Sequence, residues 1–142
     1  MSQLRDNCRV TMTDLPLASE ISAKNLEGIK QHVTFQVLDW DAAIPADILA
    51  QRLDMIVVAD CMYNADAAPA LVSVIARLAS GRPEATLVIA HKKRHDSEEE
   101  FLHLLTAAGM AMVGRTRVDI GEEYTDLEPE GVDLYAMRFV GA

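Results

Sequence analysis

The chain has 142 residues, of which 50% are hydrophobic and 25% are charged. Acidic residues outnumber basic ones by 22 to 13, so the net charge of −9 disfavours binding to nucleic acid and favours a basic protein partner. No apolar run reaches the length of a membrane span, and the first residues lack the apolar stretch of a signal peptide. We therefore expect one domain over residues 1–142, in the cytoplasm or the nucleus.

The predicted elements alternate between strands and helices. Strand-like runs occupy residues 10–13, 33–38, 55–59 and 85–90, and the last two are apolar throughout, as expected for strands covered on both faces inside a parallel sheet. Residues 69–79 carry one apolar stripe at helical spacing, formed by Leu71, Val74, Ile75, Leu78 and Ala79. This alternation predicts an α/β fold with crossover connections.

The C-terminal part follows a different pattern. Residues 97–100 fit a capping box, and Gly109 can supply the left-handed residue that ends the helix. The apolar stripe of this helix consists of Phe101, Leu104, Leu105 and Ala108. Residues 110–120 and 132–140 both read as strands with only an acidic stretch between them, which predicts a terminal antiparallel pair.

Polar residues that follow apolar strands are the first candidates for a ligand site, because ligands bind beyond the carboxyl ends of strands in doubly wound sheets. Asp14 ends the first strand, where its carboxylate can accept ribose hydroxyls or cap the helix entered through Pro16. Asp39 and Trp40 end the second strand, where they can bind and stack on an adenine ring. A lone tryptophan is also a common core residue.

Asp60 follows the five apolar residues 55–59, a position that is costly for a carboxylate unless it is paired or faces a site. Tyr63 comes shortly after it, so a carboxylate and a phenol lie together at the end of the most apolar strand. We favour a functional role for this pair over a structural one.

Two charged segments read most simply as solvated loops. The basic run at residues 91–95 is interpreted as a turn before a helix, and the acidic residues from 119 to 130 as a loop that could also steer a lysine-rich substrate. No disulfide or metal site is predicted, because Cys8 and Cys61 stand far apart and the four histidines lack the spacing of a zinc site.

Taken in order, these motifs resemble the seven-strand, S-adenosylmethionine-dependent protein-lysine methyltransferases. The shared motifs are V-T-M-T-D-L-P at residues 10–16, L-D-W at 38–40, the characteristic D-x-x-Y at 60–63 and the basic turn at 92–94. The resemblance implies a Rossmann-like class I methyltransferase sheet with helices on both faces and a C-terminal antiparallel strand pair.

Roles for individual residues follow from the same resemblance. It implies that Asp14 binds the cofactor ribose and that Asp39 and Trp40 lie beside the adenine. It also implies that Asp60 and Tyr63 line the channel of the substrate lysine, where Asp60 orders the amine and Tyr63 presents its ring to the cation.

The chain departs from this family at its start. Such methyltransferases begin with a strand and a glycine-rich G-x-G turn, whereas the first glycine here is Gly28. The family strand order is 3-2-1-4-5-7-6, and strand 1 is the one we expect to be absent, which leaves the edges of strands 2 and 4 unpaired. We therefore expect a partial domain with impaired S-adenosylmethionine binding: a truncated product, an incomplete gene model or a decayed paralogue.

Three functions are compatible with these features. The first is a protein-lysine N-methyltransferase that acts on a protein with a basic or lysine-bearing surface. The second is a non-catalytic interaction module that keeps the substrate surface of that family. The third is an unrelated flavodoxin-like or small-molecule methyltransferase domain. Binding of S-adenosylmethionine separates the first from the second.

Overall fold

The computed structural model describes residues 8–29, 32–61, 65–92, 97–119 and 131–141. They belong to two compact units, unit 1 (Met1–Ile48) and unit 2 (Leu49–Ala142). Within the described ranges, none of the helices has the length and apolarity that crossing a membrane would require.

Unit 1 is built around a two-stranded parallel sheet. Strand β1 (Val10–Asp14) pairs with β2 (Val33–Val37), and Asp14 lies opposite Val37 at the carboxyl end of the pair. The crossover between them contains the 3-10 helix η1 (Pro16–Ala18) and α1 (Ser19–Leu26), and the short α2 (Ala46–Leu49) follows β2. Both strands therefore end at the same edge.

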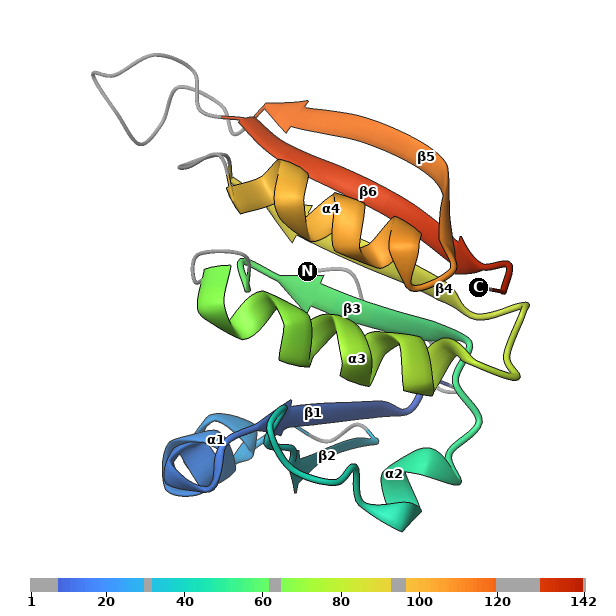
Figure 1. Cartoon of the computed structure of the whole chain (residues 1–142). Coiled ribbons are helices and arrows are strands. Elements are labelled where there is room, and N and C mark those ends of the chain that lie inside the picture. Colours follow the sequence, from blue (N-terminus) through green and yellow to red (C-terminus); the bar gives the residue numbers. More distant parts are fainter. Residues whose placement is uncertain (1–7, 30–31, 62–64, 93–96, 120–130, 142) are drawn as a thin grey trace. The chain divides into compact units, whose positions relative to one another are not determined.

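Unit 2 contains a four-stranded sheet in the order β3-β4-β6-β5 (Figure 1). Strands β3 (Met55–Ala59) and β4 (Thr86–His91) run parallel, whereas β6 (Gly131–Phe139) is antiparallel to both β4 and β5 (Met110–Asp119). The 3-10 helix η2 (Ala65–Ala67) and α3 (Ala68–Ala79) connect β3 to β4, and α4 (Ser97–Ala107) connects β4 to β5.

Most predicted elements are confirmed. All five residues of the predicted stripe on α3 are buried, Gly109 follows α4 with φ of 89°, and β5 and β6 form the expected antiparallel pair. The sheet of unit 2 has the order implied for family strands 4-5-7-6, and β1 with β2 corresponds to strands 2 and 3.

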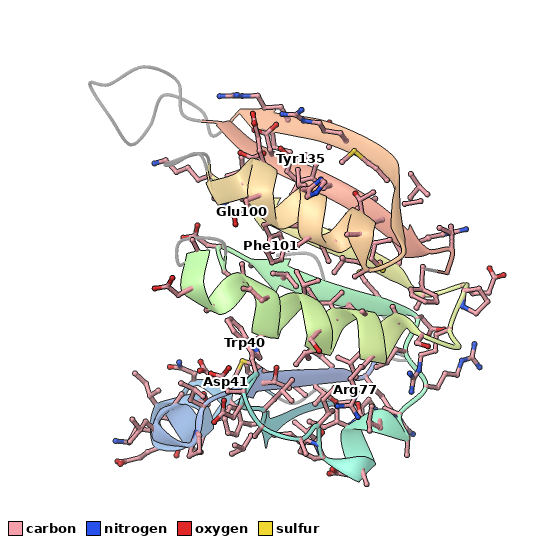
Figure 2. The ribbon with its side chains drawn as sticks, viewed as in Figure 1. Trp40, Asp41, Arg77, Glu100, Phe101 and Tyr135 are labelled. Atoms are coloured by element: carbon pink, nitrogen blue, oxygen red, sulfur yellow. The ribbon has the colours of Figure 1, made fainter. Side chains whose placement is uncertain are left out.

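One face of the unit 2 sheet forms the core with α3 and α4, which pack against each other (Figure 1). Burial alternates along the strands, so that neighbouring residues across the sheet share this covered face. The covered residues are Val58 on β3, Leu87, Ile89 and His91 on β4, and Asp133, Tyr135 and Met137 on β6. Figure 2 shows the side chains of Phe101, from α4, and Tyr135, which are among the largest fully buried ones.

The opposite face of β3 corrects an expectation from the sequence. Residues 55–59 were expected to be covered on both faces, but Met55 and Val57 are exposed. The place of β3 at the edge of its sheet is the one expected for family strand 4 without strand 1 beside it. The five-residue strand is apolar on both sides, yet α3 and α4 cover only the side that carries Val58. Within the described part of the chain, β4 is the single strand that pairs with β3.

Two adjacent valines test this one-sided burial. Val57 is 63% exposed and Val58 is 6% exposed. We expect Val58→Thr to lower the free energy of unfolding by about 1–3 kcal/mol, because a hydroxyl replaces a methyl in an apolar layer. Val57→Thr should change it by less than about 0.5 kcal/mol. Urea unfolding of both variants measures the difference, and equal losses would show that the Val57 face is buried in solution.

Candidate functional site

The carboxyl edge of β3 and β4 brings two polar residues together. The register places Ala59 opposite Ala90, so Asp60 and His91, the next residues on each strand, are neighbours. The Asp60 N–H donates a hydrogen bond of 2.9 Å to the Ala90 carbonyl, which fixes the backbone of Asp60 at the end of the ladder. Its carboxylate remains 48% exposed.

The backbone of Asp60 is unusual. Among the described residues other than glycine, it alone has a positive φ, of 52°. This left-handed region disfavours most side chains, although aspartate and asparagine tolerate it better than others. Such conformations cluster at functional sites, where the surrounding structure holds them in place. The geometry therefore supports a functional role for Asp60.

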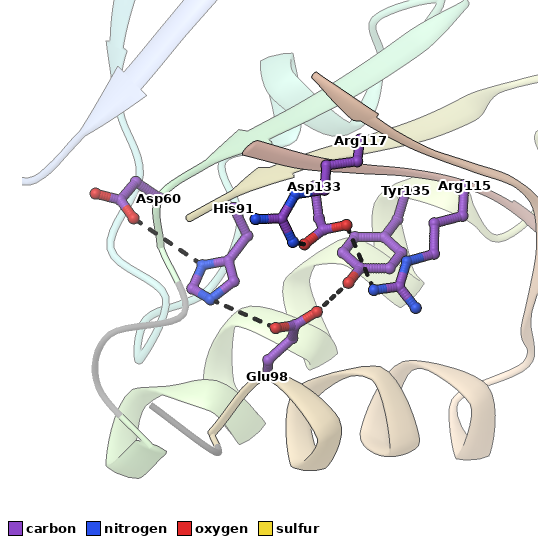
Figure 3. Close-up of polar contacts among 7 residues, drawn as sticks. All are labelled: Asp60, His91, Glu98, Arg115, Arg117, Asp133 and Tyr135. Atoms are coloured by element: carbon purple, nitrogen blue, oxygen red, sulfur yellow. Dashed lines mark hydrogen bonds and ion pairs between the residues drawn. The ribbon is translucent and has the colours of Figure 1, made fainter. Parts of the chain in front are cut away.

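A buried polar cluster lies directly beside Asp60 (Figure 3). The His91 side chain is 3% exposed, with Nδ1 4.0 Å from Asp60 Oδ1 and Nε2 3.9 Å from Glu98 Oε2. On the far side, the Tyr135 hydroxyl donates a hydrogen bond to Glu98 Oε1. The chain of contacts thus runs from the half-exposed Asp60 through His91 and Glu98 to the buried Tyr135.

Two arginines of β5 complete this cluster. Arg115 Nη2 lies 3.4 Å from Asp133 Oδ1, and Arg117 Nη1 lies 3.9 Å from Asp133 Oδ2. The Arg115 guanidinium also lies 5.1 Å from the centroid of the Tyr135 ring, within the range of a cation–π contact. Asp133 is therefore a buried carboxylate balanced by two cations.

The surroundings of Tyr135 keep its phenol protonated. Burial, the hydrogen bond to Glu98 and the negative charges of Glu98 and Asp133 all raise the pKa of Tyr135, and the nearby Arg115 opposes them only in part. Tyr135 is thus held as a hydrogen-bond donor to Glu98.

The candidate cofactor residues of unit 1 meet at the carboxyl edge of their own sheet. The Leu38 N–H donates to the Asp14 carbonyl at 2.9 Å, which brings Asp39 close to Asp14. Asp14 Oδ1 accepts the Leu15 N–H at 2.7 Å, and Asp39 Oδ1 accepts the Asp41 N–H at 3.0 Å. The backbones of Asp14 and Asp39 are therefore close to each other at one sheet edge.

The structure bears on the structural alternatives for these residues. The N-cap of η1 is Leu15 rather than Asp14, and the side chain of Leu15 makes no capping hydrogen bond. Trp40, which is labelled in Figure 2, is partly buried.

Several predicted residues lie outside the described part of the chain. They include Tyr63, residues 93–95 of the basic turn and residues 120–130 of the acidic stretch. Within the described residues, no group of three or more side chains is arranged to hold a metal ion.

The sequence analysis missed the buried cluster. His91 was expected in a solvated turn, but it is the last residue of β4 and is buried, so that expectation was wrong for this residue. Glu98 was read as part of a capping box, whereas it is buried and bonded to Tyr135. One signal was present: Asp133 and Tyr135 alternate with apolar residues along β6, which places both on one face.

The left-handed backbone of Asp60 can be tested by comparing two variants. Asp60→Gly should be more stable to urea than Asp60→Ala by about 1 kcal/mol, because glycine adopts positive φ without the steric cost of a Cβ atom. Both variants remove the carboxylate, so the difference between them reports the backbone alone. Equal free energies of unfolding would contradict the positive φ.

The raised pKa of Tyr135 predicts a loss of stability in alkali. The unfolded chain releases the phenol proton above about pH 10, whereas the folded chain retains it, so the free energy of unfolding should fall as the pH rises further. Below that pH the contribution is fully present. In Tyr135→Phe, the free energy of unfolding measured with urea should no longer show this fall with rising pH. An unchanged fall would refute the burial of an ionisable phenol.

Comparison with known proteins assigns the family. Residues 1–108 match the family model described as lysine methyltransferase. The chain is 34% identical over 97 residues to UPF0665 family protein C23C4.06c of Schizosaccharomyces pombe, covering 66% of this chain and 29% of that protein. It is 38% identical over 82 residues to the human protein-lysine N-methyltransferase EEF2KMT, covering 58% and 23%.

Solved structures agree on the fold. The N,N-8-amino-8-demethyl-D-riboflavin dimethyltransferase RosA of Streptomyces davawensis matches with a TM-score of 0.65 at 16% identity, over 92% of this chain and 42% of that one. The chain spans less than a third of the length of the two curated relatives. It belongs to the lysine methyltransferase family and adopts the class I methyltransferase fold.

Proposed function

We propose that the chain acts in S-adenosylmethionine-dependent N-methylation of lysine in a protein, with Asp60 as the residue that binds the substrate amine. One observation carries this proposal. Asp60 combines a half-exposed carboxylate, a left-handed backbone and a buried imidazole neighbour at the carboxyl edge of parallel strands. This edge is where ligands bind in open α/β sheets.

Methyl transfer from S-adenosylmethionine to an amine requires little covalent participation by the protein. When bound, S-adenosylmethionine supplies a methyl group activated by its sulfonium charge, and the lysine must present a neutral amine in line with it. A carboxylate at this point can accept a hydrogen bond from the amine and orient its lone pair. Asp60 suits this role because its carboxylate is accessible while its backbone is fixed. Tyr63 is proposed to line the same lysine channel.

For the cofactor, we propose that the adenosine part is held by unit 1. Asp14 and Asp39 lie at one sheet edge, and the hydrogen bonds to Leu15 and Asp41 engage one oxygen of each carboxylate. The second oxygens suit the ribose hydroxyls and the adenine amino group, with Trp40 as a stacking surface. These residues fit the adenosine half of the cofactor.

The glycine turn is where the fit is incomplete. The glycine-rich turn of the family follows its strand 1, whereas β1 corresponds to its strand 2, and the first glycine of the sequence, Gly28, comes after α1. A glycine turn allows the backbone to approach a ligand closely. We therefore propose weak binding of S-adenosylmethionine by this chain.

The proposed substrate is a protein with a basic, lysine-bearing surface. The net charge of −9 attracts such a surface and repels nucleic acid. The relative EEF2KMT is itself a protein-lysine N-methyltransferase.

A two-part experiment tests the proposal on the 142-residue chain. Calorimetry should detect binding of S-adenosylmethionine, and a labelled methyl group should pass from it to lysine in the proteins of a cell extract. Asp60→Asn keeps the size and backbone preference of the residue but removes its charge. We expect it to lower methyl transfer by about 100-fold or more, while the affinity for S-adenosylmethionine changes only a few fold.

Asp54→Asn provides the matched control, because Asp54 lies just before the other end of β3 and its side chain is exposed. This variant should transfer methyl groups at the normal rate. Undiminished transfer by Asp60→Asn would refute the role of Asp60. A chain that binds no S-adenosylmethionine would be inactive in this form and would favour the non-catalytic interaction module.

A further inference from the structure

The buried imidazole of His91 is a feature that the proposed function does not explain. Its side chain is 3% exposed, and neither ring nitrogen has a hydrogen-bond partner among the residues that the structure describes, although each faces a carboxylate at about ion-pair distance. Buried polar atoms are nearly always hydrogen-bonded, so two buried ring nitrogens without such bonds require an explanation. The side chain would satisfy both nitrogens only if the neighbouring carboxylates moved closer.

Hydrogen-bond accounting fixes the direction of these contacts. An ionised carboxylate only accepts, so the ring nitrogen that faces Asp60 must carry a hydrogen to bond with it. On the other side, Tyr135 donates to Glu98 Oε1, which leaves Oε2 to face His91 Nε2. A single proton between Glu98 Oε2 and His91 Nε2 serves this contact, whether it is bonded to the carboxylate or to the imidazole. The Nδ1–H is therefore directed at Asp60.

We propose that His91 is a positioning residue that orients the Asp60 carboxylate through its Nδ1–H, and that Glu98 and Tyr135 hold the imidazole in place. This inference rests on the proposed function, in which Asp60 binds the substrate amine. Figure 3 shows one oxygen of Asp60 directed at the imidazole and the other directed away from it.

Exposure and distance distinguish the two members of this pair. The Asp60 side chain is 48% exposed, whereas the imidazole that faces it is buried in the core. The 4.0 Å between Asp60 Oδ1 and His91 Nδ1 exceeds a hydrogen bond by about 1 Å. Catalytic hydrogen bonds are often long before the substrate binds and shorten in the complex.

The cross-strand neighbour of His91 cannot take the place of Asp60. Asp133 lies opposite His91 in the ladder between β4 and β6. Both of its carboxylate oxygens face arginines, Arg115 and Arg117. Among the described residues, the carboxylates that face the ring nitrogens of His91 are those of Asp60 and Glu98.

Nitrogen NMR of the free chain tests this arrangement without any need for activity. Long-range proton–nitrogen correlation spectra show which ring nitrogen of each histidine carries a hydrogen, and His91→Asn identifies the signals of His91. We expect a hydrogen on Nδ1. Asp60→Asn should shift the Nδ1 resonance, Glu98→Gln should shift Nε2, and the control Asp54→Asn should shift neither. The proposal would be overturned if Nδ1 carried no hydrogen, or if its resonance did not change in Asp60→Asn.

A kinetic comparison then links the arrangement to methyl transfer. His91→Asn keeps an N–H donor near the position of Nδ1, whereas His91→Leu fills the space without one. We expect His91→Leu to lower kcat for methyl transfer by about 10–100-fold with little change in KM, and His91→Asn to recover most of that loss. Equal losses in the two variants would mean that His91 supports only the fold.

The two proposals fail in different ways. If the wild-type chain transfers no methyl group but Asp60→Asn still shifts His91 Nδ1, the proposed function fails while the positioning of Asp60 stands. If methyl transfer depends on Asp60 but the NMR signals of His91 do not respond to it, the positioning role fails alone. Circular dichroism of His91→Leu establishes that it folds, and the NMR comparison decides the question where it does not.

Discussion

The parallel pairing of β3 with β4 is the constraint on which the candidate site depends. Both strands end at one edge of the sheet, and their register makes Asp60 and His91 neighbours, with the Asp60 N–H bonded to Ala90. A slip of one residue would turn every side chain of β3 to the other face. Val58 would then leave the core, and the backbone of Asp60 would lose the contact that holds its left-handed conformation.

The polar cluster ties this edge to distant parts of the sequence. Glu98 comes from the first turn of α4, Tyr135 and Asp133 from β6, and the two arginines from β5. Removing one partner from a buried network leaves the others desolvated and unpaired, which costs far more than the contact itself contributes. The position of His91 is therefore coupled to the correct packing of the whole C-terminal half, although the reacting groups would lie at β3.

The sequence predicts elements well and contacts less well, for physical reasons. The stripe on α3 and the glycine after α4 follow from local periodicity and backbone preference, and both are confirmed. The positions of Asp14 and Asp39 at one sheet edge, and the placement of Asp60 at a strand end, follow from parallel strands alone. The burial of His91 does not, because it depends on Glu98 and on a tyrosine 44 residues later. The exposure of Val57 escapes prediction because an apolar run looks the same whether one face is covered or two.

The single covered face of the unit 2 sheet also shapes how this unit responds to temperature. The heat capacity change of unfolding grows with the apolar surface that becomes hydrated. Met55 and Val57 are already in contact with water in the folded chain, so their hydration adds little when it unfolds. The stability curve of unit 2 should thus be flatter than that of a sheet of equal length sandwiched between two helical layers, and cooling should weaken it less.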